Sequence, residues 1–132
     1  MTATLEPTDN ALRTRAKLDS ADAIDELVRR RRNGVIDPST TPLWREPSAV
    51  RLRFADYFVG SVVEVDVDLH RDASNVVTHV GRLVSSAFGG TSGAVVLRFP
   101  LEDNRRDRLI ELARVADIRW APAANKLARF PV

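Results

Sequence analysis

Residues 61–88, SVVEVDVDLHRDASNVVTHVGRLVSSAF, decide the fold class of this 132-residue chain. Between residues 63 and 69 every second residue is valine or leucine, and the residues between them are the acidic Glu64, Asp66 and Asp68. An alternation of period two predicts a half-buried strand, apolar on one face and acidic on the other. The polar stretch 71–75 has turn chemistry, and residues 76–88 predict the next strand.

Further segments extend this pattern on both sides. Residues 94–99, 108–112 and 118–120 predict three short strands, with a glycine-rich hairpin loop at 89–93 and a tight turn at 113–117. Upstream, Val50, Leu52 and Phe54 alternate with arginines, so period two begins at about residue 49. The expected fold is mainly β: a small five-stranded SH3/Sm-like barrel over residues 49–121, with an N-terminal helix and extended arms. The pattern does not distinguish a closed barrel from an open, strongly curved sheet. Side chains fill the interior of so narrow a barrel, which leaves no room for an internal ligand.

The order of these segments resembles Sm-like and other SH3-like small barrels over about half of the chain. The resemblance lies in FVGSVVEV (58–65), HVGRLV (79–84), AVVLRF (94–99) and IELARVADIRW (110–120). It implies a fold and no RNA-binding residues, because the family's RNA-contacting Asp and Asn are missing from SSAFGGTSG (85–93). The PilZ barrel is less similar, since Val77 stands where the glycine of its D-x-S-x-x-G motif belongs.

Residues 1–48 are predicted to form an N-terminal arm outside the barrel. Residues 1–18 are polar, and we expect them to be disordered unless a partner orders them. A helix is predicted at about residues 20–32, capped by Asp19 or Ser20 and ended by Gly34. A proline-rich linker (35–48) leads into the barrel, and residues 122–132 predict a C-terminal tail.

Composition excludes several classes of protein. The chain has no cysteine, which excludes a disulfide scaffold, a thiolate metal site and a cysteine nucleophile. Its net charge of only +2 indicates no strong positive field for a polyanion. No apolar run approaches the ~18 residues of a membrane span, and the N-terminus lacks the apolar core of a signal peptide. We therefore expect a cytoplasmic protein, or part of a particle assembled in the cytoplasm.

The apolar residues of the arm and the tail are the candidate partner-binding residues. None of these segments can form a core alone, so their apolar side chains either cover the chain's own barrel or dock on another subunit. Trp44 is expected to anchor the linker on the barrel. The candidates are Ile24, Leu27, Val28, Trp44, Leu127 and Phe130.

A run of four arginines at the end of the predicted helix is the candidate for nucleic-acid contact: Arg29, Arg30, Arg31 and Arg32. Arginine pairs well with phosphate oxygens. The favoured interpretation is a solvated helix end stabilised by the helix dipole, because four consecutive side chains point around a helix. Arginines on the strands are expected to pair across strands with Glu64, Asp66 and Asp68.

Catalytic, metal and cofactor sites are not expected. Strand spacing keeps Glu64, Asp66 and Asp68 too far apart to converge on one cation. The two histidines, His70 and His79, are a poor metal site by themselves. The glycine-rich loop lacks the lysine and the following helix of a phosphate-binding loop.

These observations favour a non-enzymatic assembly or adaptor protein. Its terminal arms would dock on protein subunits, either copies of itself or other proteins, in an oligomer or a large phage-like assembly. The alternative is a nucleic-acid-binding or regulatory protein on an Sm-like barrel, with the four arginines on phosphates.

Overall fold

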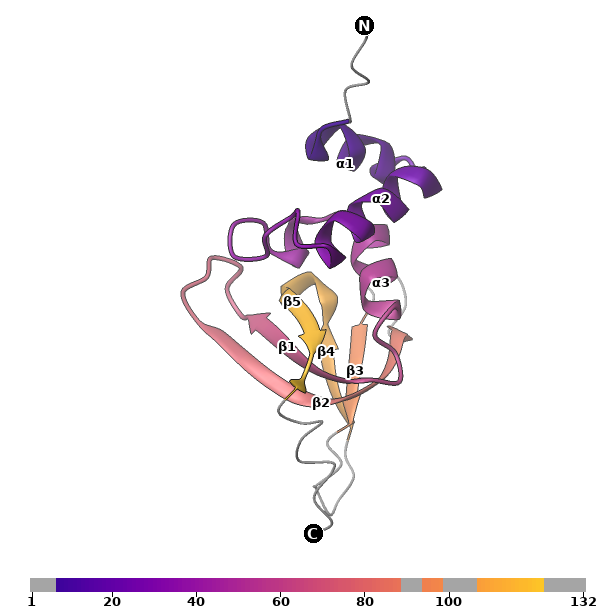
Figure 1. Ribbon diagram of the computed structural model, residues 1–132. Coiled ribbons are helices and arrows are strands. Elements are labelled where there is room, and N and C mark those ends of the chain that lie inside the picture. Colours follow the sequence, from indigo (N-terminus) through magenta and orange to yellow (C-terminus); the bar gives the residue numbers. More distant parts are fainter. Residues whose placement is uncertain (1–6, 89–93, 99–106, 123–132) are drawn as a thin grey trace, which may run out of the picture.

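The computed structural model describes residues 7–88, 94–98 and 107–122 (Figure 1). Its helices come first in the chain: α1 (Asp9–Lys17), α2 (Ala21–Arg32), the 3-10 helix η1 (Leu43–Arg45) and α3 (Ser48–Asp56). The strands follow: β1 (Val62–Asp68), β2 (Val76–Phe88), β3 (Ala94–Arg98), β4 (Asp107–Glu111) and β5 (Val115–Trp120). A second 3-10 helix, η3 (Leu112–Arg114), joins β4 to β5.

The five strands form one antiparallel sheet in the order β4-β3-β2-β1-β5. The long strand β2 organises it, because residues 76–82 pair with β1 and residues 82–88 pair with β3. In β1, Val63, Val65 and Val67 are buried, as the period-two pattern predicts. The strands expected at 76–88 and 94–99 are confirmed within a residue, and those near 108–112 and 118–120 are longer or shifted.

The prediction of a mainly β, five-stranded barrel is confirmed only for its five strands, which form an open sheet. The described residues hold three α-helices beside the sheet, so the fold is a small mixed α/β fold. The sheet is curved but open, with β4 at one edge and β5 at the other (Figure 1). Helices supply the second layer that a closed barrel would not need.

The period-two pattern at Val50, Leu52 and Phe54 belongs to a helix, α3, which corrects the expectation of an extended segment there. Val50 and Phe54 are four residues apart, so they also share one face of a helix. Both are buried, together with Ala55, whereas Leu52 is only partly covered. Over so few residues, apolar side chains four positions apart fit the two-residue period of a strand and also the 3.6-residue period of a helix.

The described part of the first 18 residues is also ordered, contrary to the expected disorder. Thr8 caps α1 by accepting a hydrogen bond from the backbone N–H of Ala11 at 3.1 Å. Leu12 and Ala16, one helical turn apart, are 2% and 1% exposed. The helix predicted at 20–32 is confirmed as α2, with Ser20 as its cap and Gly34 at a positive φ of 78° after its end.

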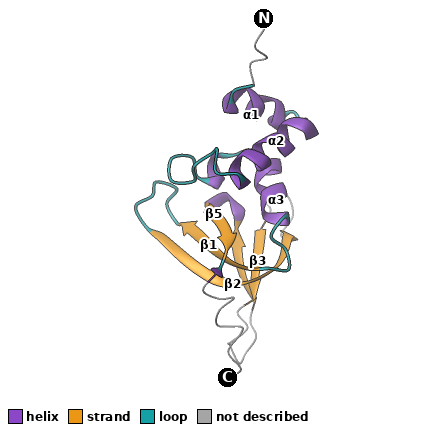
Figure 2. Cartoon of the chain, viewed as in Figure 1, coloured by secondary structure: helices purple, strands orange, loops and turns teal. Residues whose placement is uncertain are grey.

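Helices and sheet share one hydrophobic core. The helices lie together on one side of the curved sheet, with α1 farthest from the strands (Figure 2). One cluster of buried side chains joins Leu27 of α2, Leu43 of η1 and Val50 of α3 to Val65 of β1 and Leu97 of β3. The division of the chain at residue 49, between an arm and a folded domain, stays a prediction. Residues on both sides of this position belong to the same core.

Replacing Leu27 by alanine tests this shared core. Leu27 is 0% exposed, so Leu27→Ala removes buried methyl groups and leaves a cavity. We expect the free energy of unfolding to fall by about 2–5 kcal/mol. Leu18→Ala is the matched control, because Leu18 is 79% exposed; its effect should stay within about 0.5 kcal/mol. Urea unfolding measures both, and equal effects would contradict a core that includes α2.

Candidate functional site

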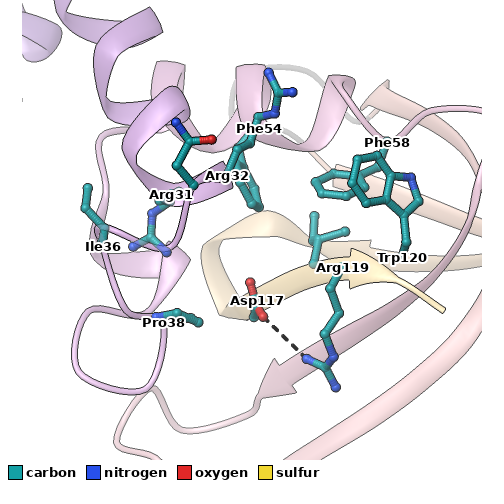
Figure 3. A pocket seen from close by; sticks show the side chains of 11 residues that line it. Arg31, Arg32, Ile36, Pro38, Phe54, Phe58, Asp117, Arg119 and Trp120 are labelled. Atoms are coloured by element: carbon teal, nitrogen blue, oxygen red, sulfur yellow. Dashed lines mark hydrogen bonds and ion pairs between the residues drawn. The ribbon is translucent and has the colours of Figure 1, made fainter. Parts of the chain in front are cut away.

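A cleft of about 230 Å³ lies where the end of α2 and helix α3 meet the edge strand β5 (Figure 3). We call it the β5 cleft. It combines arginines, one carboxylate and aromatic rings in one small space. Its lining residues are Arg31, Arg32, Asn33, Ile36, Pro38, Phe54, Phe58, Asp117, Ile118, Arg119 and Trp120.

Behind one wall of the cleft, Glu46 gathers arginines from three helices. Glu46 is 1% exposed. Arg13 of α1 donates from Nε to its Oε1 at 2.6 Å, and Arg31 of α2 donates from Nε to its Oε2 at 3.0 Å. Arg51 of α3 donates to the Glu46 backbone carbonyl at 2.6 Å. Burial lowers the pKa of Arg31, and the Glu46 carboxylate opposes this shift.

The opposite wall carries a charged group centred on Arg119. Its guanidinium donates to Glu64 at 2.9 Å, to Asp66 at 2.7 Å and to Asp117 at 3.4 Å. Three carboxylates therefore surround one cation. Burial raises the pKa of Asp117, and the charge of Arg119 only partly offsets this effect. This wall is acidic on balance.

Aromatic rings form the rim. Trp120 packs edge-on against Phe58, with 5.1 Å between ring centroids, and against Tyr57 at 5.6 Å. Trp120 is 50% exposed and Tyr57 42%. The Arg32 guanidinium lies over the Tyr57 ring, 3.5 Å from its centroid, and also donates a hydrogen bond to the Tyr57 hydroxyl. A large exposed aromatic surface beside an arginine is typical of recognition sites.

The structure separates the four arginines of the predicted nucleic-acid site. Arg30 and Arg31 are 6% and 7% exposed. Arg30 pairs with Asp9 at 2.7 Å and Glu26 at 2.9 Å, and Arg31 pairs with Glu46. Arg29 pairs with Glu26, whereas Arg31 and Arg32 both line the cleft, and of these two only Arg32 is exposed. Two of the four side chains thus hold the chain's own helices together.

The candidate partner-binding residues also turn inward where the structure describes them. Ile24, Leu27 and Val28 are buried in the core of the same chain. Trp44 donates from its indole nitrogen to Asp68 at 3.2 Å, so it anchors the linker on β1, as expected. Leu127 and Phe130 lie outside the described residues.

The acidic strand residues have structural roles. Glu64 and Asp66 pair with Arg119, as the expected cross-strand pairing requires. Asp68 is 1% exposed and accepts bonds from the backbone N–H of Ala73 at 2.9 Å and of Asp72 at 3.3 Å. It thereby fixes the turn to β2. In the ladder His79 lies opposite Val65, so it does not face His70 across the sheet.

Sequence reasoning missed the residues that form the cleft. The sequence pattern places Asp117 in a tight turn and Trp120 in the last short strand, and it singles out neither Trp120 nor Tyr57 as a site residue. One available signal was the end of the last strand, Ile118-Arg119-Trp120, where a large aromatic follows an arginine at the edge of the sheet. The meeting of this strand with the end of α2 depends on tertiary structure.

Two searches within the described residues bear on function. No helix there is both long and apolar enough to cross a bilayer. No three His, Cys, Asp or Glu side chains in that part of the chain are grouped as a metal site requires. Comparison with protein families, with curated proteins and with solved structures finds no match for this chain. The function must therefore be argued from the cleft itself.

Glu46→Gln tests the ion cluster behind the cleft. The amide removes the charge that balances Arg31, whose side chain is 2% exposed. Breaking a buried pair at one partner leaves an uncompensated charge, so we expect a loss of about 3–5 kcal/mol in the free energy of unfolding. Glu111→Gln is the control, because Glu111 is 63% exposed and 3.8 Å from Arg114; it should change stability by less than about 1 kcal/mol. Similar urea midpoints for both variants would contradict the assigned role.

Asp117→Asn tests the acidic wall through pH. Folding raises the pKa of Asp117, so the native state binds more protons than the unfolded state between the two pKa values. The stability contributed by Asp117 is present below the unfolded pKa of about 3.9 and is lost as pH rises through the folded pKa. The asparagine variant should therefore gain stability relative to the original protein between about pH 3.5 and pH 7. Urea unfolding at both pH values measures this difference, and a constant or falling difference would refute it.

Proposed function

We propose that this protein is a non-enzymatic adaptor that binds another protein subunit through the rim of the β5 cleft. The single observation that carries the proposal is the exposed aromatic rim, in which Trp120 and Tyr57 lie beside Arg32. Tryptophan, tyrosine and arginine are enriched among the few residues that dominate the binding energy of protein interfaces. Such residues are effective because they bury a large area and lose little conformational freedom.

The pairing of the charged groups around the cleft supports recognition over proton transfer. Arg31 is held by Glu46, and Asp117 lies against Arg119. A general acid or base needs a free path to a reacting group and a partner that positions it. Here the buried charges position the walls of the cleft, and the exposed rim is left for contact.

The docking surface proposed here differs from the terminal arms expected from the sequence. Leu27 and its neighbours on α2 are covered by the chain's own core, so they are satisfied without a partner. We propose that the partner protein binds to the rim of the cleft instead. The partner is either a second copy of this chain or another protein.

Nucleic acid is the second candidate, because Arg32 lies over the exposed Tyr57 ring, which itself packs against the exposed Trp120. Proteins that bind single strands stack bases on such rings and place cations beside them. The burial of Arg30 and Arg31 against carboxylates argues against an extended phosphate track. The experiment below separates the two candidates.

Photo-crosslinking in the cells that make the protein tests the proposal. A benzophenone amino acid replaces Val59, which is 40% exposed and close in sequence to Tyr57, or, as a control, Leu109 on β4, which is 56% exposed. We expect a protein adduct from position 59, absent from position 109, and reduced about tenfold or more by Trp120→Ala. An adduct that nuclease removes would favour nucleic acid. Equal adducts at both positions, or none, would refute the adaptor proposal.

A further inference from the structure

The Arg32 side chain has an unusual electrostatic position. Its guanidinium stacks on Tyr57 and donates to the Tyr57 hydroxyl, which is a neutral acceptor. Among the described residues, no carboxylate forms an ion pair with it. The neighbouring Arg29, Arg30 and Arg31 each pair with Glu26 or Glu46. Arg32 is therefore an exposed and oriented cation that forms no ion pair within the described residues, although Asp25 and Asp56 line a second hollow with it.

The other charged groups around the cleft determine where a negative charge on a bound partner would be favourable. Asp117 and Arg119 line the wall opposite Arg32 (Figure 3), and Arg119 also pairs with Glu64 and Asp66 behind that wall. Three carboxylates for one cation thus lie at or behind that wall, and they repel a further negative charge. An incoming carboxylate is therefore favoured at Arg32 and disfavoured at the far wall.

Between these two ends the cleft is apolar. Phe54, Phe58 and Ile118 form its inner surface, and the half-exposed Trp120 completes its apolar lining. Its volume of about 230 Å³ lies below the ~300–1,000 Å³ of pockets that enclose a drug-sized ligand or a cofactor. The space fits a single bulky side chain entering from the rim.

We infer that the β5 cleft binds a segment of a partner protein in which a bulky apolar side chain stands beside a carboxylate. The apolar side chain enters the cleft against Phe58 and Trp120, and the carboxylate pairs with Arg32 at the rim. This inference rests on the proposed adaptor function and specifies the chemistry of the partner. A planar guanidinium already oriented by an aromatic ring loses little freedom when it pairs with a carboxylate.

Three short peptides, capped at both ends, test the inference. The first has a glutamate next to a phenylalanine, the second replaces the glutamate by glutamine, and the third replaces the phenylalanine by alanine. Titrations follow the indole N–H signal of Trp120 in ¹⁵N-labelled protein, with the indole of Trp44 as the internal reference. Trp44 is bonded to Asp68 and does not line the cleft, so its signal should not move.

We expect the first peptide to shift the Trp120 signal at the lowest concentration. The second should bind about threefold to fivefold more weakly, as for a partly exposed ion pair. The third should bind about tenfold more weakly or worse, because it lacks the buried ring. Equal binding of all three peptides, or no shift of the Trp120 signal at millimolar peptide, would refute the inference.

Two protein variants locate the carboxylate. Arg32→Gln should bind the first two peptides equally, because the charged partner is gone. Arg114→Gln is the matched control: Arg114 is an exposed arginine on η3 that lies 3.8 Å from Glu111 and does not line the cleft. It should keep the preference for glutamate. If both variants lose that preference, the effect is general surface charge and the inference is wrong.

The peptide experiment and the crosslinking experiment can refute the partner chemistry and the adaptor function independently of each other. A protein adduct at position 59 without a preference for glutamate beside phenylalanine would leave the adaptor proposal standing and refute the partner chemistry. The absence of any adduct at position 59 refutes the adaptor itself. Thermal unfolding of each variant shows whether a lost shift reflects lost binding or a lost fold.

Discussion

The burial of the Glu46 carboxylate is the constraint on which the rest of this structure depends. An ionised carboxylate away from water is stable only when cations and donors surround it. Arg13 and Arg31 supply two guanidinium groups, and Arg51 bonds the Glu46 backbone. These three arginines come from α1, α2 and α3, so the carboxylate and the backbone carbonyl of this one residue connect all three helices. The arrangement of these helices places the end of α2 beside β5 and so creates the cleft.

Helical geometry places some of the four consecutive arginines, Arg29 to Arg32, in the interior and leaves others at the surface near the cleft. Successive residues in an α-helix are about 100° apart, so residues 29 and 32 share one face and residues 30 and 31 point elsewhere. Arg30 and Arg31 reach Asp9 and Glu46 and become part of the interior. Arg32 remains on the exposed face over Tyr57. A sequence that looks like one basic cluster therefore has a structural half and an exposed half.

The sequence predicted those parts of the fold that local patterns determine. Valines at every second position of β1, the turn before Val76 and the Ser20 cap of α2 are signals within a few residues, and the structure confirms them. The segment around Val50 and Phe54 was predicted as extended but forms a helix. Two apolar residues four positions apart share one face in a strand and also in a helix, so their spacing does not distinguish the two. Glu46 is 33 residues from Arg13 and 15 from Arg31, and no local pattern reports such a pairing. The cleft depends on that pairing, so the candidate site could not be predicted from the sequence.

Openness of the sheet and the position of the cleft have a common origin. A closed barrel covers both edge strands by pairing them, whereas here the described residues leave β4 and β5 as separate edges. The space beside β5 is filled instead by η1 and the ends of the helices, whose side chains cannot match the regular spacing of a strand. Because these side chains do not fill the space beside β5 completely, a small cleft is left there. Phe58, Asp117 and Trp120 are among the residues that line it. The charge on Arg32 and the carboxylates around Arg119 then give the cleft two unlike ends, so that its chemistry follows from how the helices cover an unpaired strand.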